Sequence, residues 1–417
     1  MTGPNKPPPP STIPGQKASG HDLRQLQTHV AKLLGRDSTR FPGAQPVSFT
    51  GKHLQELLER DYYVCEKSDG IRCLMYLTSN TEHQEMVFLI DRKNDYYLVP
   101  ELHFPRMEDV AAFHVDTIVD GELVNDLEKD GSVTMKYLVF DCMVLDGQPL
   151  LDRILDKRLG YFRERVHKPF VRCFEEFPED RAHLPFYVDF KHMERSYGLQ
   201  VVFDEILPNL PHGNDGLIFT NRNTPYHPGT DPNIVKWKPP DENSIDFRLY
   251  LQFPPLSPSS SDEESSSTNG VITPHHELPA LDYAAFPTFH LAVGMNNGQE
   301  ARFSTMYASS ADLTQIKSLG RPLDEAVIEC YQDSEHRWRF MRVRDDKLEP
   351  NHISTVERVM ESISDRITKE QLTASTKNIR MQWKLREKEE MDREKAIAKA
   401  RGAATAAAGT QNGKQEH

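Results

Sequence analysis

The sequence of 417 residues lacks paired cysteines, an excess of positive charge and long apolar runs. Its five cysteines form no Cys-x-x-Cys pair, which argues against a disulfide framework or a structural zinc site and favours a reducing compartment. The net charge is −13, so any contact with nucleic acid must come from a local basic cleft. No stretch of 18 apolar residues and no apolar N-terminal core is present, which predicts neither a membrane span nor a secretory signal.

Hydrophobic residues are also scarce, at 37% against 27% charged residues, so we expect part of the chain to be disordered. Three segments fit this expectation: a Pro-rich tail over 1–19, an acidic Ser/Pro-rich insertion over 254–275, and a charged helix or disordered tail over 371–417. The insertion could carry phosphorylation sites or be an inert loop, and the sequence leaves both readings open.

Hydrophobic periodicity predicts the ordered elements. Short β-branched and aromatic runs between 61 and 145, separated by turn-forming residues, indicate an antiparallel sheet. A second set of strand-like runs between 246 and 344 indicates a smaller β-domain. The segment 41–49 reads as an extended, Pro-punctuated loop. Helical spacing is found at 22–34, 150–165, 192–206 and 352–368.

The chemistry-bearing residues begin with Lys67, which ends a hydrophobic strand. Gly70 lets the chain turn tightly just after it, and Asp69 and Arg72 lie within reach. Taken alone, Lys-x-Asp-Gly is also what a surface hairpin turn contains.

Further motifs follow in a fixed order. They are Asp120-Gly121-Glu122, Phe140-Asp141, Asp215-Gly216-Leu217-Ile218, Val235-Lys236-Trp237-Lys238-Pro239, and a final Arg342-x-Arg344-x-Asp346-Lys347 that precedes Pro350-Asn351. On a strand, residues two apart share a face, so Lys236 and Lys238 point the same way. Trp237 then points to the opposite side, and we expect it to pack in the core.

These six motifs, with FPGAQPVS before the first, resemble those of the covalent nucleotidyltransferases, and most closely the mRNA capping enzyme guanylyltransferases of the free-standing fungal type. The resemblance covers about residues 20–360. It implies an α+β fold with a nucleotidyltransferase domain of antiparallel β-sheets at 20–240 and an OB-fold β-barrel domain at 241–350. We expect a helix at 351–370 to pack near the domain junction.

The resemblance also implies roles for the motif residues. Lys67 would be the catalytic nucleophile, supported by the turn at Asp69 and Gly70. A free lysine has a pKa of about 10.4, so cationic neighbours or desolvation must activate such an amine near neutral pH. Glu122 and Asp215 offer hard oxygens for Mg²⁺ or Mn²⁺. The implied GTP contacts are Arg72 and Arg92 on the ribose, Phe140 on the base, Lys236 and Lys238 on the α-phosphate, and Arg342, Arg344 and Lys347 on the β- and γ-phosphates when the cleft closes.

The implied reaction transfers GMP from GTP through a lysyl–GMP intermediate to a 5′-diphosphate RNA, forming a GpppN cap. An ATP-dependent polynucleotide ligase shares the lysine chemistry and is the alternative enzyme. A catalytically dead nucleotide-binding scaffold is a third hypothesis, against which the intact Lys67 and both acids argue. Some relatives place a guanine-reading lysine before the fourth motif, where this chain has Gly213 and Asn214, so guanine selection stays open.

No His-Cys-x5-Arg phosphatase signature is present, so the 5′-triphosphatase step is expected from a separate subunit in a heterodimer or heterotetramer. The resemblance further implies binding to the phosphorylated C-terminal domain of RNA polymerase II and a nuclear location, with no membrane partner.

Overall fold

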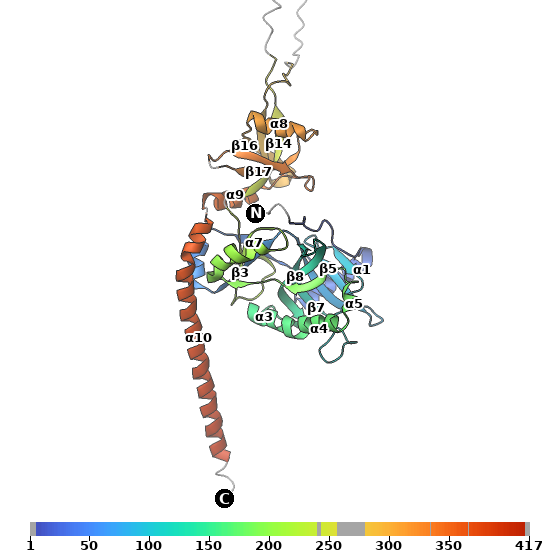
Figure 1. Cartoon of the computed structure of the whole chain (residues 1–417), viewed down its shortest axis with the longest axis vertical. Helices are drawn as coiled ribbons and strands as arrows, with labels where there is room; N and C mark the ends of the chain where they lie inside the picture. Colours follow the sequence, from blue (N-terminus) through green and yellow to red (C-terminus); the bar gives the residue numbers. More distant parts are fainter. Residues whose placement is uncertain (1–5, 240–242, 257–279, 334, 366, 413–417) are drawn as a thin grey trace, which may run out of the picture. The chain divides into compact units, whose positions relative to one another are not determined.

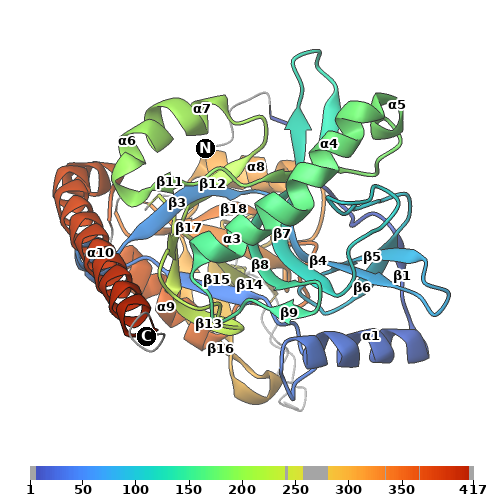
Figure 2. The same ribbon diagram turned by 90° about the horizontal axis from the view of Figure 1, so that it is seen from below.

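The computed structural model describes residues 6–239, 243–256, 280–333, 335–365 and 367–412 (Figures 1 and 2). These residues divide into two compact units. The larger unit comprises the described residues up to Pro239 and those from Ile367 onward. The barrel unit comprises the described residues between them.

The larger unit is built on two β-sheets, between which the chain passes more than once. In the first sheet the strand order is β1-β6-β5-β4-β7-β8-β10, with β9 pairing β8; in the second it is β11-β3-β12-β13-β2. The first sheet contains β1 (Gln16–Lys17), β4 (Ile71–Ser79), β5 (Glu85–Ile90), β6 (Tyr96–Val99), β7 (Thr117–Leu127), β8 (Val133–Leu145), β9 (Gln148–Pro149) and β10 (Tyr187–Phe190). The second contains β2 (Ala44–Ser48), β3 (Tyr62–Ser68), β11 (Glu194–Arg195), β12 (Asn214–Asn221) and β13 (Gly229–Trp237).

The chain passes from the second sheet to the first between β3 and β4, through Asp69 and Gly70 alone. A Cβ at Gly70 would lie 2.3 Å from the Leu123 carbonyl oxygen and 2.9 Å from Glu122 Cγ. Only glycine permits this close approach, since any side chain would push β3 and β4 away from β7. The tight link therefore fixes the end of β3 against the first sheet.

Helices cover both sheets (Figure 2). On one face of the first sheet, α1 (Gly20–Leu33) contributes Val30 to a core with Leu74 and Phe88. The opposite face packs against α3 (Leu155–Phe162), the π-helical turn η1 (Arg163–His167) and α4 (Lys168–Glu176), as Figure 2 shows. The second sheet shares its core with α2 (Gly51–Glu59), with the short helical segments η2 (Ser196–Gly198), α6 (Leu199–Val201), η3 (Val202–Ile206) and α7 (Leu207–Asn209), and with the long α10 (Lys369–Asn412). A further short helix, α5 (Pro178–Arg181), follows α4.

The barrel unit closes a sheet in the order β14-β15-β16-β18-β17. Its strands are β14 (Ser244–Gln252), β15 (Thr288–Gly294), β16 (Glu300–Met306), β17 (Val327–Gln332) and β18 (Trp338–Val343), with η5 (Asn296–Gly298), α8 (Ser310–Ser318) and α9 (Ile353–Ser364) beside them. Phe247, Leu291 and Ile328 fill the interior without exposure to solvent. A closed five-stranded barrel is the OB-fold architecture, so the α+β class with a C-terminal barrel is confirmed.

Several local expectations need correction. The sheets are not wholly antiparallel, because β10 pairs with β8 and β2 with β13 in parallel. The segment 41–49 is not all loop: β2 is an edge strand, a position that tolerates its proline. Within the tail expected to be disordered, β1 pairs with β6 through main-chain hydrogen bonds that need no side-chain pattern. Residues 1–5 and 257–279 lie outside the described part.

The helical expectations are corrected too. The helix expected at 150–165 begins at Leu155, and the one expected at 192–206 is a series of short segments. The helix expected at 351–370 ends at Ser364, and the fully buried Val356 packs it on the barrel core. The charged segment after 371 belongs to α10, which is helical to Asn412.

All five cysteines are buried free thiols. Among the described helices, none has the length and apolar character needed to cross a bilayer.

Candidate active site

Lys67 lies at the end of β3, next to β12, which carries Asp215; Lys238 follows β13, the strand on the other side of β12. Its Nζ donates to Asp215 Oδ1 on β12 at 2.6 Å, and Lys238 Nζ, just beyond β13, lies 2.8 Å from Asp215 Oδ2. Burial alone would raise the pKa of Asp215, but the two ammonium groups outweigh it and hold the pKa below its ordinary value. One carboxylate therefore bridges two lysines.

Gly216 makes this arrangement possible. Its φ is +131°, and a Cβ there would lie 2.1 Å from the Trp237 carbonyl oxygen. No other residue fits both conditions, so β12 approaches β13 closely enough for Asp215 to meet Lys238. Trp237 itself is buried in the core beneath, which confirms the predicted alternation, and Lys236 is half-buried on the same strand.

The other face of β3 carries a buried charge network that the sequence analysis missed. Glu66 Oε1 lies 2.8 Å from Lys191 Nζ and 3.3 Å from His212 Nε2, and all three residues are buried. His212 Nδ1 lies 2.6 Å from Asp126 Oδ1. Burial opposes ionisation of Glu66, but Lys191 and His212 prevail and lower its pKa to about 2.

One signal for this network was present in the sequence. Period-2 alternation along β3 places Glu66 on the face of Tyr62 and Val64, which are core residues, so a buried partner was required. Nothing local identifies Lys191 or His212 as that partner, because they lie more than a hundred residues away.

At the start of β4, Arg72 is held by a buried carboxylate. Its Nε and Nη2 donate to Asp120 Oδ1 and Oδ2 at 3.1 and 2.6 Å, and Asp120 has no exposed surface. Burial alone would lower the pKa of Arg72, but Asp120 reverses this and raises it. The guanidinium lies over the Phe140 ring, 5.4 Å from its centroid. Phe140 is half-buried.

Arg92 and Glu122 complete the set in the larger unit. Desolvation and the charge of Arg72 lower the pKa of Arg92. Burial raises the pKa of Glu122, against the opposing charges of Lys191, Lys67, Arg72 and Arg92, in that order. Glu122 and Asp215 therefore both lie within the electrostatic reach of Lys67, and Asp69 is exposed in the link between β3 and β4.

The described residues contain no cluster of three or more His, Cys, Asp or Glu side chains able to hold a metal ion alone. Glu122 and Asp215 still fit Mg²⁺ or Mn²⁺, because such ions keep several waters and are commonly held by one or two carboxylates together with substrate phosphates. Asp215 would have to give up part of its contact with the two lysines to take this role.

The remaining predicted residues belong to the barrel unit, where acids hold them. Arg342 Nε donates to Glu329 Oε2 at 2.6 Å, and Arg344 Nη1 donates to Asp246 Oδ1 at 2.9 Å. Lys347 also donates to Asp246. The buried Asp246 thus collects two of the three cations on one side of the barrel.

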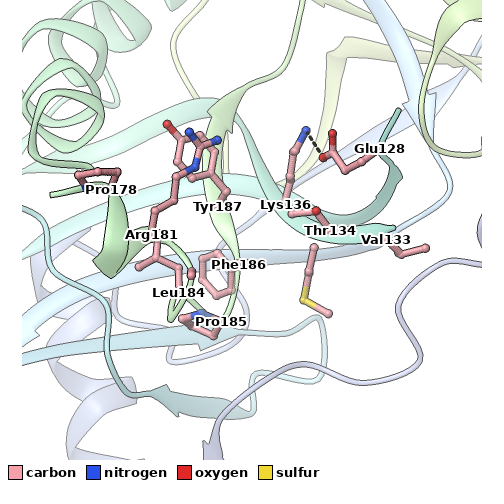
Figure 3. Close-up of a pocket in the computed structure, with 12 residues that line it drawn as sticks. Glu128, Val133, Thr134, Lys136, Pro178, Arg181, Leu184, Pro185, Phe186 and Tyr187 are labelled. Carbon is pink, nitrogen blue, oxygen red and sulfur yellow. Dashed lines mark ion pairs between the residues drawn. The ribbon is translucent and has the colours of Figure 1, made fainter. Parts of the chain in front are cut away.

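A separate surface pocket of about 700 Å³ lies in the larger unit, beside the start of β8 (Figure 3). Its lining includes Arg181, Phe186 and Tyr187, and an ion pair between Lys136 and Glu128 is seen at its edge. None of the predicted site residues lines this pocket.

A strand-borne lysine held by a carboxylate that also holds a second lysine, in a chain whose C-terminal unit is an OB-fold barrel, fits the class of covalent nucleotidyltransferases. Comparison with known proteins narrows the class. Residues 10–240 match the family model for the mRNA capping enzyme catalytic domain, and residues 242–373 match that for the mRNA capping enzyme C-terminal domain. The chain belongs to the mRNA capping enzyme family.

Curated relatives agree with this assignment. The mRNA-capping enzyme subunit alpha of Neurospora crassa is 45% identical over 384 residues, covering 89% of this chain and 93% of the relative. That of Schizosaccharomyces pombe is 42% identical over 388 residues, covering 92% of each. Among solved structures, mycobacterial DNA ligase D complexed with ATP and MES aligns at 14% identity and a TM-score of 0.34, covering 73% of this chain and 95% of that one. A likeness at that score carries no argument about function.

Proposed function

We propose that the chain, an mRNA guanylyltransferase by family, works through a lysyl–GMP intermediate at Lys67. The observation that carries the proposal is the carboxylate bridge in which Asp215 holds both Lys67 and Lys238 at motif positions of the family. This bridge fixes the lysine amine at the end of a rigid strand, which is the preorganisation that nucleophilic attack requires.

In the first half-reaction, Lys67 Nζ attacks the α-phosphorus of GTP as a free amine. A nitrogen–phosphorus bond forms, the bond from the α-phosphorus to the bridging oxygen breaks, pyrophosphate leaves, and the amine nitrogen gives up one proton to solvent. Lys236 and Lys238 neutralise charge on the α-phosphate, while Arg72, Arg92 and Phe140 hold the nucleoside, as the family resemblance assigns.

The second half-reaction passes GMP from Lys67 to the terminal phosphate of a 5′-diphosphate RNA. This restores the lysine and forms the GpppN cap.

Glu122 and Asp215 are the residues that would hold Mg²⁺ or Mn²⁺. The ion supplies charge stabilisation on the transferring phosphoryl group. The barrel cations Arg342, Arg344 and Lys347 are assigned to the β- and γ-phosphates. The acids that now hold them leave Arg342 largely exposed, with 64% of its side chain accessible, and so available to an anionic ligand.

The relatives' designation as subunit alpha supports a partner subunit. We propose a separate RNA 5′-triphosphatase as that partner in a heterodimer or heterotetramer, binding to the phosphorylated C-terminal domain of RNA polymerase II, and a nuclear location, all as the family resemblance implies.

The test uses full-length protein, GTP or ATP labelled at the α-phosphate, and Mg²⁺ or Mn²⁺, without RNA. Label from GTP alone should stay on the denatured protein, be released by pyrophosphate and disappear in Lys67→Ala. Label from ATP instead would move the assignment to polynucleotide ligase. Absence of label in folded wild-type protein, even with a triphosphatase subunit added, would refute the proposal.

A further inference from the structure

We propose that Tyr226 is a positioning residue for the GTP ribose: its hydroxyl fixes the carboxylate of Asp120, which in turn orients Arg72. The inference rests on the proposed function, since the ribose contact of Arg72 belongs to it. Tyr226 lies outside every motif described in the sequence.

The contacts form a continuous buried path. Tyr226 Oη donates to Asp120 Oδ2 at 2.6 Å, and the same oxygen of Asp120 accepts from Arg72 Nη2 at 2.6 Å. Tyr226 is 4% exposed and Asp120 is fully buried. Burial, followed by the charge of Asp120, raises the pKa of Tyr226 well above its ordinary value, so the hydroxyl keeps the proton that it donates.

The backbone of the segment FPGAQ (41–45) also contacts both Tyr226 and Arg72. The backbone N–H of Ala44 donates to Tyr226 Oη at 2.8 Å, while the Ala44 carbonyl accepts from Arg72 Nη1. A Cβ at Gly43 would lie 3.3 Å from Arg72 Nη2, so the backbone here runs close beside the guanidinium. The one peptide segment therefore touches both ends of the path, and Tyr226 closes the ring of contacts.

The Tyr226 ring is itself held in place. Arg158 lies over it, 5.8 Å from the ring centroid, and forms a bidentate pair with Asp141 at 2.7 and 2.8 Å. The Tyr226 backbone N–H also donates to the Leu151 carbonyl at 2.8 Å. With its ring clamped and its hydroxyl shared between Ala44 and Asp120, Tyr226 has one orientation, and the carboxylate of Asp120 is fixed with it.

This arrangement matters for a ribose contact because Asp120 uses both oxygens on Arg72. A carboxylate that rotates carries the guanidinium with it, and hydrogen bonds to sugar hydroxyls depend on direction. Loss of the Tyr226 hydroxyl should therefore weaken binding of nucleotides that have ribose hydroxyls and leave the transfer step at Lys67 unchanged.

The experiment compares wild-type protein with Tyr226→Phe, using GTP and 2′,3′-dideoxy-GTP, in the lysyl–GMP assay. We expect the half-saturating concentration of GTP to rise about tenfold, the size of one hydrogen bond within a charged pair, with an unchanged maximal rate. For the dideoxynucleotide, the half-saturating concentration should stay at the wild-type value.

Tyr76→Phe is the matched control, since Tyr76 is equally buried and its hydroxyl also donates to a carboxylate, that of Asp116 at 3.1 Å. Tyr76→Phe should leave the half-saturating concentrations of both nucleotides at their wild-type values. Asp120→Asn, which keeps the shape of the side chain, should show the same nucleotide-dependent loss as Tyr226→Phe.

An unchanged GTP dependence in both Tyr226→Phe and Asp120→Asn, or an equal loss with both nucleotides, would overturn the inference. Wild-type protein that takes no label from GTP would overturn the proposed function instead, so the two failures are distinguishable.

Discussion

The buried pair of Glu66 and Lys191 gives the sharpest test of how the strand that carries Lys67 is held in place. Each side chain is about 3% exposed, and their charged atoms lie 2.8 Å apart. Breaking such a pair from one side leaves a buried charge uncompensated and costs about 3–5 kcal/mol. We therefore expect Lys191→Met and Glu66→Gln each to lower the free energy of unfolding by that amount, whereas the double variant should lose less than either.

The assay is urea unfolding followed by tryptophan fluorescence. Trp237 and Trp383 are buried in the larger unit and Trp338 in the barrel core, so a Trp338→Phe background reports on the larger unit alone. Additive losses in the double variant would refute the reasoning, because the pair would then have no coupling energy.

The pH dependence provides an independent check with a definite sign. Folding lowers the pKa of Glu66 from 4.5 to about 2, a difference equivalent to about 3 kcal/mol. A depressed carboxyl pKa contributes stability that is present above pH 4.5 and is lost as the pH falls toward 2. Glu66→Gln should therefore lack this part of the acid sensitivity. An acid-unfolding curve that changes in midpoint but keeps the wild-type steepness between those pH values would contradict the assignment.

Two further predictions concern the carboxylate bridge and the long helix. Asp215→Asn removes the charge between Lys67 and Lys238 and should slow lysyl–GMP formation about 10²- to 10³-fold, with little change in melting temperature. The measurement is the initial labelling rate, with the exposed Asp189→Asn as the control. A labelling rate within a few fold of wild type would contradict the prediction. Trp383 is 1% exposed, so Trp383→Ala should lower the free energy of unfolding in urea by about 3–5 kcal/mol. Met381 lies on the exposed face of the same helix, and Met381→Ala should change that free energy by less than about 0.5 kcal/mol. Equal losses in the two variants would show that α10 is not part of the core.

The features of the site that could be predicted from the sequence lie within short segments of the chain. The motif around Lys67 and the tight turn at Gly70 lie within six residues, and the alternation that buries Trp237 needs only the period of a strand. Lys191 and His212 are single charged residues far along the chain. Their partners could be found only from the fold, although the buried face of β3 signalled that Glu66 needed one.

Strands that form through main-chain pairing were the second feature that could not be predicted from the sequence. The strands β1 and β2 lack apolar alternation, and they form because neighbouring strands offer free N–H and C=O groups. For α10 the difficulty was the charge of the segment. Its buried anchors Leu372, Ile379 and Trp383 recur at helical spacing, but the many charged residues of the segment masked that stripe.

The two faces of β3 explain how one short strand could carry the chemistry proposed for Lys67. Lys67 points to the site and meets Asp215, while Glu66 and Ser68 on the opposite face meet Lys191 and the histidine of the buried network. A lysine on a flexible loop would lose conformational entropy on each encounter with the phosphate. Here the adjacent residues are fixed by buried charge pairs, and Gly70 binds the end of the strand to the first sheet, where Arg72 starts. Lys67, the proposed nucleophile, and Arg72, the residue assigned to the ribose, are thus separated by four residues of backbone whose position the core sets, so changes in that core should alter catalysis without touching the substrate.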